Sequence, residues 1–114
     1  MTYPIMTYDE SWSLDQAYDK FVKSYECTGR HIQRHDIFDP LNGIGKVFSS
    51  HEPGKLVTFI VYGGNWSSDE AREIAAFVEG IRNVRSPFVT GTTSVRILSK
   101  HRNVPGALQE YIGP

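Results

Sequence analysis

The chain has 114 residues, of which 39% are hydrophobic, 12% aromatic and 22% charged, and its formal net charge at pH 7 is −1. This composition excludes an intrinsically disordered protein, and a chain of this length can bury one core but hardly two, so we expect one α+β domain over residues 1–114. The sequence opens without a basic segment followed by an apolar stretch, and we expect neither export nor membrane insertion.

The first section of the chain predicts a strand followed by a helix. The strand is expected at Tyr3–Tyr8. Ser13 and Gln16 have the spacing of a capping box, and apolar residues then recur at helical intervals. With Gly29 as a stop signal, these features predict an amphipathic helix over residues 14–27.

The middle of the chain predicts a meander of three strands. Two clusters of turn-forming residues, 39–43 and 51–54, separate the apolar stretches. The strands are expected near Arg30–Phe38, Ile44–Ser50 and Lys55–Tyr62. The third is a nearly continuous run of β-branched and aromatic residues, which is typical of a central strand with both faces at least partly covered.

The last section repeats the helix signals and adds a strand. Ser67 and Glu70 form a second capping-box pattern ahead of an apolar periodicity, which predicts a helix over residues 68–82. Alternating residues predict a late strand at 93–99. The stretch 107–112 is expected to form one turn of helix or a docked tail.

The two helix starts share the pattern Y-x-x-x-W-S-x-D-[QE]-A, at Tyr8–Ala17 and at Tyr62–Ala71. Two interpretations remain open: similar capping chemistry at unrelated helices, or an internal repeat of a strand–turn–helix unit. The repeat favours an α+β, ferredoxin-like (split βαβ) fold, with an antiparallel sheet of four to six strands and two helices packed on one face. That fold hosts many unrelated functions and does not imply one.

The four histidines and the single cysteine, Cys27, are candidate metal ligands or reactive groups. On an extended segment, His31 and His35 lie roughly 13 Å apart and cannot share an ion, and recruiting His51 does not change this expectation. Cys27 follows a helix, whose C-terminal dipole disfavours a thiolate, so we expect a buried or half-buried structural thiol in a reducing cytoplasm. The common catalytic motifs are missing from the sequence. No catalytic residue, metal or cofactor is predicted.

The turn Gly63–Asn65 precedes a capped helix, where free N–H groups attract anions. The plainer interpretation, which we favour, is a tight turn whose donors Ser67 already satisfies. Trp12 and Trp66 stand at equivalent positions of the two helix starts. They are predicted either to staple the helices or, if the repeat is real, to anchor an interface at one end of the sheet.

Basic residues are concentrated in the last third of the chain. Residues 1–79 contain seven basic and twelve acidic side chains, whereas residues 80–109 contain five basic and no acidic ones. This asymmetry predicts a basic face that binds a partner. The predicted partner-binding residues are Arg82, Arg85, Arg96, Lys100 and Arg102.

Three functions follow from these features. The leading hypothesis is a small non-enzymatic binding protein that regulates or inhibits a macromolecular partner, which we expect to be a protein, through a charged surface. Phage and bacterial accessory factors are proteins of this kind, and a second copy of the chain, giving a homodimer, is another candidate partner. The alternatives are nucleic-acid binding through residues 82–102 and a small-molecule enzyme or binder that uses Tyr8, Tyr62 or a histidine.

Overall fold

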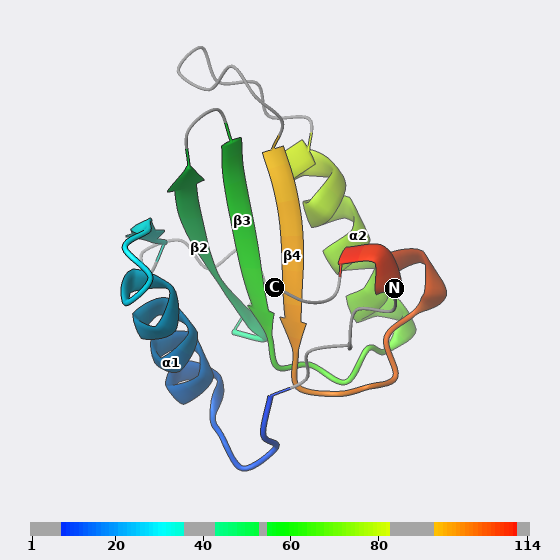
Figure 1. The fold of residues 1–114 in the computed structure, drawn as a ribbon. Coiled ribbons are helices and arrows are strands. Elements are labelled where there is room, and N and C mark those ends of the chain that lie inside the picture. The colour runs from blue at the N-terminus through cyan, green and yellow to red at the C-terminus, as the bar shows by residue number, and fades with distance from the viewer. Residues whose placement is uncertain (1–7, 36–42, 53–54, 83–92, 112–114) are drawn as a thin grey trace.

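The computed structural model describes residues 8–35, 43–52, 55–82 and 93–111 (Figure 1). Its elements, in chain order, are α1 (Leu14–Glu26), β1 (His31–Arg34), β2 (Gly45–Glu52), β3 (Lys55–Tyr62), α2 (Ser68–Arg82), β4 (Thr93–Ser99) and a 3-10 helix η1 (Gly106–Tyr111). Neither α-helix in the described part of the chain is long and apolar enough to cross a bilayer.

Most element boundaries agree with the sequence predictions. The strands at 55–62 and 93–99 and the helix at 68–82 are confirmed with their predicted limits, and α1 ends one residue early. Both halves of the capping box at Ser13 are present. Strand β1 is shorter than expected, four residues long. Of the strand predicted at 3–8, only Tyr8 belongs to the described residues.

The four strands form one mixed sheet in the order β1-β2-β3-β4. β1, β2 and β3 are antiparallel neighbours, whereas β3 and β4 are parallel neighbours in direct contact. The prediction of an antiparallel sheet was therefore wrong for this last pair, and the ferredoxin-like arrangement is not confirmed. Adjacent parallel strands need a long crossover, and α2 lies within that connection, so β3, α2 and β4 make an undivided βαβ unit.

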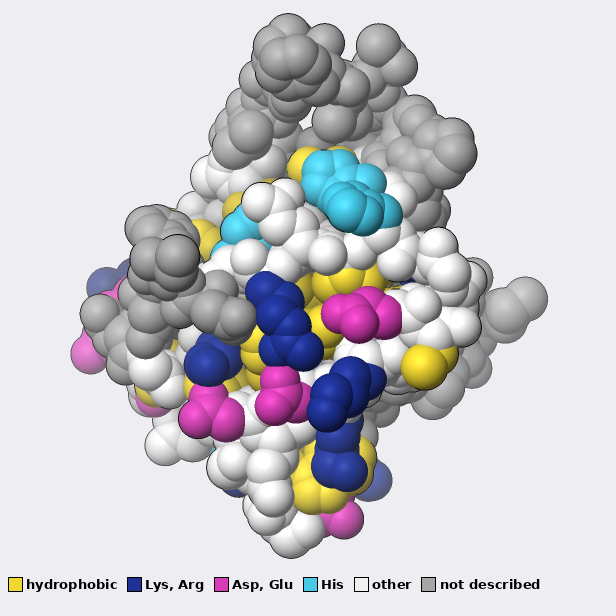
Figure 2. Space-filling view, turned by 90° about the vertical axis from the view of Figure 1, so that its left-hand side faces the viewer, with side chains coloured by type: hydrophobic (Ala, Val, Ile, Leu, Met, Phe, Trp, Pro, Cys, Tyr) yellow, Lys and Arg dark blue, Asp and Glu magenta, His cyan; other side chains and the backbone are white. Residues whose placement is uncertain are grey.

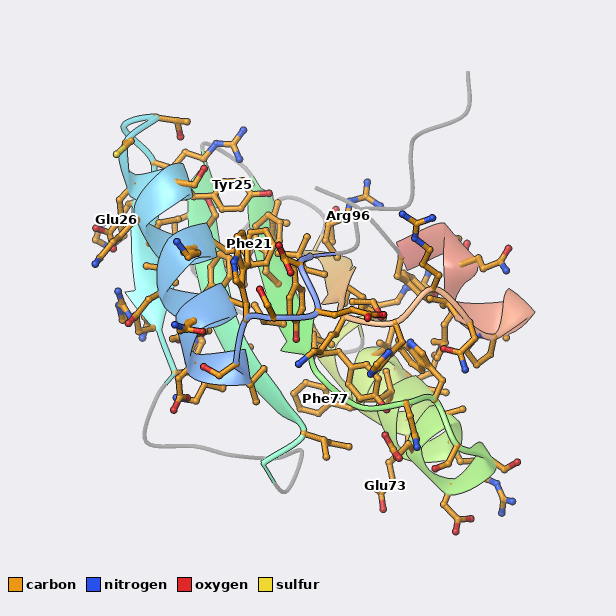
Figure 3. The ribbon with its side chains drawn as sticks, turned by 90° about the horizontal axis from the view of Figure 1, so that it is seen from below. Phe21, Tyr25, Glu26, Glu73, Phe77 and Arg96 are labelled. Carbon is orange, nitrogen blue, oxygen red and sulfur yellow. The ribbon has the colours of Figure 1, made fainter. Side chains whose placement is uncertain are left out.

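The two α-helices cover opposite faces of the sheet, which corrects the prediction that both pack on one face. Residues of α1 pack in a core cluster with Phe48 and Phe59, whereas α2 packs in another cluster with Ile60 and Ile97. Figure 3 shows the strands between α1 and α2, with side chains of both helices directed toward them. The result is two cores separated by one sheet.

The alternation of β3 explains why both faces need a helix. Val57, Phe59 and Val61 belong to the α1 cluster, and Ile60 and Tyr62 to the α2 cluster. All five are buried, with at most 7% of each residue exposed. Because successive side chains of a strand point to opposite faces, this apolar run can be shielded from water only by cover on both sides.

Candidate partner-binding surface

The structure brings two of the predicted basic residues together at the outer side of β4. Arg82, from the last turn of α2, and Arg96, from β4, line a cleft of about 220 Å³. We call this the α2–η1 cleft; its lining residues are Arg82, Ser94, Val95, Arg96, Glu110 and Tyr111. Figure 3 shows Arg96 projecting from β4 on the side away from α2.

Tyr111 contacts Arg82 within this cleft through both its hydroxyl and its ring. An Arg82 guanidinium nitrogen donates a 2.7 Å hydrogen bond to the Tyr111 hydroxyl, and the guanidinium carbon lies 5.8 Å from the centre of the phenol ring. Arg96 donates a longer bond, 3.4 Å, to the backbone carbonyl of Glu110. Since Tyr111 accepts from Arg82, its own O–H proton remains available to a ligand, as do the other guanidinium N–H groups.

Lys100 and Arg102 belong to a second, larger cleft beyond the end of β4. Its volume is about 490 Å³; its lining residues, which define the β4-end cleft, are Tyr8, Asp9, Glu10, Lys100 and Arg102. The Lys100 ammonium donates a 3.0 Å hydrogen bond to the carbonyl of Trp12. Arg96 lies within β4 and Lys100 directly follows its last residue, so consecutive parts of one chain segment contribute to the two clefts.

Acidic residues accompany both basic pairs, so the charge separation in the sequence is only partly kept in space. Asp9 and Glu10 line the β4-end cleft, and a Glu79 carboxylate oxygen lies 3.7 Å from Arg82. Arg85 lies outside the described residues. On the α1 side of the molecule, basic and acidic side chains also alternate (Figure 2). The predicted basic face is therefore two small basic pairs, each with carboxylates beside it.

The two tryptophans lie at the same end of the sheet but in different settings. Trp66 is buried, with 6% of the residue exposed, and its indole N–H donates a 3.0 Å bond to the Ser99 hydroxyl. Trp12 is half-buried and stacks on Tyr8, with ring centres 6.4 Å apart. Trp66 is therefore a core residue and not an exposed interface anchor, whereas Trp12 remains a candidate anchor beside the β4-end cleft.

The turn between β3 and α2 satisfies its own donors. The Ser67 hydroxyl accepts from the Glu70 N–H at 3.3 Å, and the Asn65 side chain accepts from the Ser67 N–H at 3.2 Å. Trp66 adopts a positive φ of 61°, in the left-handed region that bulky residues rarely occupy. These bonds favour the tight-turn interpretation over an anion site at Gly63–Asn65.

Glu70 closes this turn by accepting from three partners. Its carboxylate accepts from the Tyr62 hydroxyl, from the Asn65 N–H at 3.2 Å and from the Ser67 hydroxyl at 3.0 Å. The hydrogen bond from Tyr62 is the largest cause that lowers the pKa of Glu70. Burial, followed by the bond to Glu70, raises the pKa of Tyr62. The carboxylate is thus held ionised, and the Tyr62 hydroxyl is already engaged.

The histidines and the cysteine considered as candidate ligands or nucleophiles do not line either cleft. β1 is extended, as predicted for the segment that carries His31, and His35 contacts the Ser49 hydroxyl at 2.9 Å. Cys27 is exposed, so the prediction of a buried or half-buried thiol was wrong. It caps α1 beyond the buried stripe formed by Ala17, Tyr18 and Val22. Within the described residues, no three histidine, cysteine or acidic side chains are grouped to hold a metal ion.

Sequence reasoning missed Tyr111 as a member of the candidate site. The residue was expected to belong to a helical turn or docked tail, and η1 confirms the helical turn. The sequence of the stretch 107–112 does not indicate that the Tyr111 phenol contacts Arg82, because that contact joins residues 29 positions apart.

Comparison with known proteins adds no relative: the sequence matches no family model, and neither a curated protein nor a solved structure is significantly similar to it. The function must therefore be argued from the geometry of this chain.

Proposed function

We propose that the chain is a small non-enzymatic protein that binds a partner protein, and thereby regulates or inhibits it, through the α2–η1 cleft. The observation that carries the proposal is that Arg82, which donates to the Tyr111 hydroxyl, lines the same cleft as Arg96. Two guanidinium groups and a phenol offer several donors to one carboxylate, and arginine and tyrosine are enriched among residues that dominate protein interfaces. The expected partner presents an acidic side chain at this cleft.

The charge pattern supports a protein partner over nucleic acid. Nucleic-acid binding draws its affinity from basic side chains that neutralise successive phosphates. Here Asp9 and Glu10 share a cleft with Lys100 and Arg102, so these basic residues do not form one continuous surface that could neutralise successive phosphates. The aromatic residues of β2 and β3 are buried in the two cores and cannot stack on bases.

A small-molecule function receives less support from the residues suggested for it. The Tyr8 hydroxyl donates a 3.0 Å bond to the carbonyl of Tyr62, and the Tyr62 hydroxyl bonds to Glu70. Both phenols are thus occupied by contacts that hold the fold together. A second copy of this chain remains a candidate partner, since its carboxylates could meet the same cleft.

Quantitative affinity capture from the native host tests the proposal. The R82E/R96E variant should lose a protein that the wild-type chain retains, because both donors to the carboxylate are reversed in charge. The matched control is K23E/R72E, which has the same change in net charge at two exposed helix residues away from both clefts. Equal capture by the two variants, or no partner that the wild type retains specifically, would overturn the proposal.

A titration with random DNA and RNA tests the nucleic-acid alternative. We expect no binding by fluorescence anisotropy at low salt. Salt-sensitive binding that R82E/R96E abolishes and K23E/R72E retains would instead favour nucleic acid as the partner.

A further inference from the structure

We propose that His31 and His51 form a binding site for one divalent transition-metal ion of the late first row, such as Cu²⁺, Ni²⁺ or Zn²⁺. The inference is independent of the partner proposed above. It rests on a pairing between strands that sequence spacing did not show: the sequence predicted that His31 and His35 are too far apart to share an ion, and that His51 does not change this.

The register of β1 and β2 places the two histidines directly opposite each other. Opposite residues of antiparallel strands point to the same face of the sheet, with Cβ atoms about 5 Å apart. The ring centres of His31 and His51 lie 5.8 Å apart. Both residues are exposed, and Figure 2 shows neighbouring histidine side chains forming a patch on the surface. The imidazoles are thus close together and open to an ion from solvent.

The chemistry of the pair suits late transition metals. Imidazole nitrogen binds these ions at about 2.0–2.1 Å, so two donors that share one ion must come within about 3–4 Å of each other. Rotation about the exposed side-chain bonds can bring ring nitrogens to that separation from the observed spacing of the ring centres. Water would complete the coordination. Cu²⁺ should bind most tightly, following the general order of stability for divalent ions.

Among the residues that the structure describes, the groups nearest in the sequence are engaged elsewhere. The nearest cation in the sequence, Arg30, has its guanidinium carbon 5.3 Å from the centre of the Tyr25 ring on α1, away from the face that His31 shares with His51. His35 is engaged with Ser49 and lies four residues from His31 along the chain. His101 lies after the end of β4, a strand that pairs with β3 and not with β1 or β2. The site therefore consists of two histidines and no third protein ligand from the described residues.

Calorimetric titration with CuCl₂ and NiCl₂ tests the proposal, using tag-free protein in a C27S background so that the exposed thiol does not compete. We expect one ion per chain. H31N and H51N should each weaken binding at least about tenfold, because each leaves a single imidazole. H35N and H101N are matched controls and should change the affinity less than about twofold.

Amide NMR spectra locate the ion directly. Paramagnetic Cu²⁺ should broaden signals around residues 31 and 51, and this broadening should be lost in H31N. Unchanged affinity in both H31N and H51N, an equal loss in H35N, or broadening centred elsewhere would overturn the assignment. Circular dichroism of each variant checks that the histidine substitution leaves the fold intact.

Discussion

The Tyr8 hydroxyl donates a 3.0 Å hydrogen bond to the backbone carbonyl of Tyr62, which lies 54 residues further along the chain. The same carbonyl accepts a 3.0 Å bond from the Lys100 N–H, and the Tyr8 N–H donates to the carbonyl of Ser99 at 3.1 Å. Tyr8 therefore joins the carboxyl ends of both parallel strands. This junction also forms one wall of the β4-end cleft.

Replacing Tyr8 with phenylalanine tests the strength of the junction. Y8F should lower the free energy of unfolding by about 1 kcal/mol, the usual net contribution of one buried hydrogen bond. The loss stays modest because the Tyr62 carbonyl keeps its bond from Lys100. Urea denaturation measures the change. Y25F serves as the control and should alter stability by less than about 0.5 kcal/mol, since Tyr25 contributes mainly its ring to the α1 core.

High pH should weaken the fold through the same residue. Burial raises the pKa of Tyr8 from 10.0 to about 12. A raised pKa in the folded state means that the unfolded chain ionises first, so stability is complete below pH 10 and falls as the pH rises toward 12. Denaturation at about pH 9 and about pH 11 should show a smaller fall for Y8F than for the wild type. Identical falls would show that other groups dominate.

Substituting alanine at Gly64 and at Gly80 should change stability in opposite directions, because only Gly64 is closely surrounded by other atoms. A Cβ at Gly64 would overlap the Glu70 carboxylate and the Tyr62 hydroxyl, so G64A should destabilise the fold by about 1–3 kcal/mol. A Cβ at Gly80 would meet no atom within 4 Å, and the residue lies inside α2. G80A should therefore stabilise by about 0.5–1 kcal/mol. Chemical denaturation of both variants checks the signs, and a neutral G64A would contradict the packing of the turn.

Acid should weaken the turn between β3 and α2. The pKa of Glu70 is lowered, first by the Tyr62 hydroxyl, so its contribution is present above the ordinary carboxyl range and is lost as the pH falls through the lowered value. E70Q should be less stable than the wild type at neutral pH, and the difference should shrink below about pH 4. Denaturation midpoints at neutral and acid pH measure it. A constant difference would remove Glu70 as an acid-sensitive contact.

Local sequence signals predicted the elements but not their arrangement. Capping residues and apolar periodicity located α1 and α2, because these signals depend on neighbours within one or two turns. The shared helix-start pattern favoured the wrong topology, because capping chemistry at two helices does not determine which strands pair. The apolar run of β3 already required cover on both faces, and the order β3, α2, β4 was compatible with a parallel pair.

The candidate sites depended on contacts that no local pattern contains. The pairing of Arg82 with Tyr111 joins α2 to η1, and that of His31 with His51 follows from the register of β1 on β2. Charge along the chain did draw attention to Arg82 and Arg96, which line one cleft in the structure. It could not reveal that Asp9 and Glu10 would fold beside Lys100 and Arg102, since these residues are about ninety positions apart.

The central claim is that Arg82 and Arg96 together bind an acidic partner protein. Isothermal titration of the purified captured partner against wild type, R82E/R96E and K23E/R72E tests it most directly. We predict that R82E/R96E raises the Kd at least about tenfold, that K23E/R72E leaves it within about twofold, and that added salt weakens the wild-type complex. Equal Kd values for all three chains would contradict the claim.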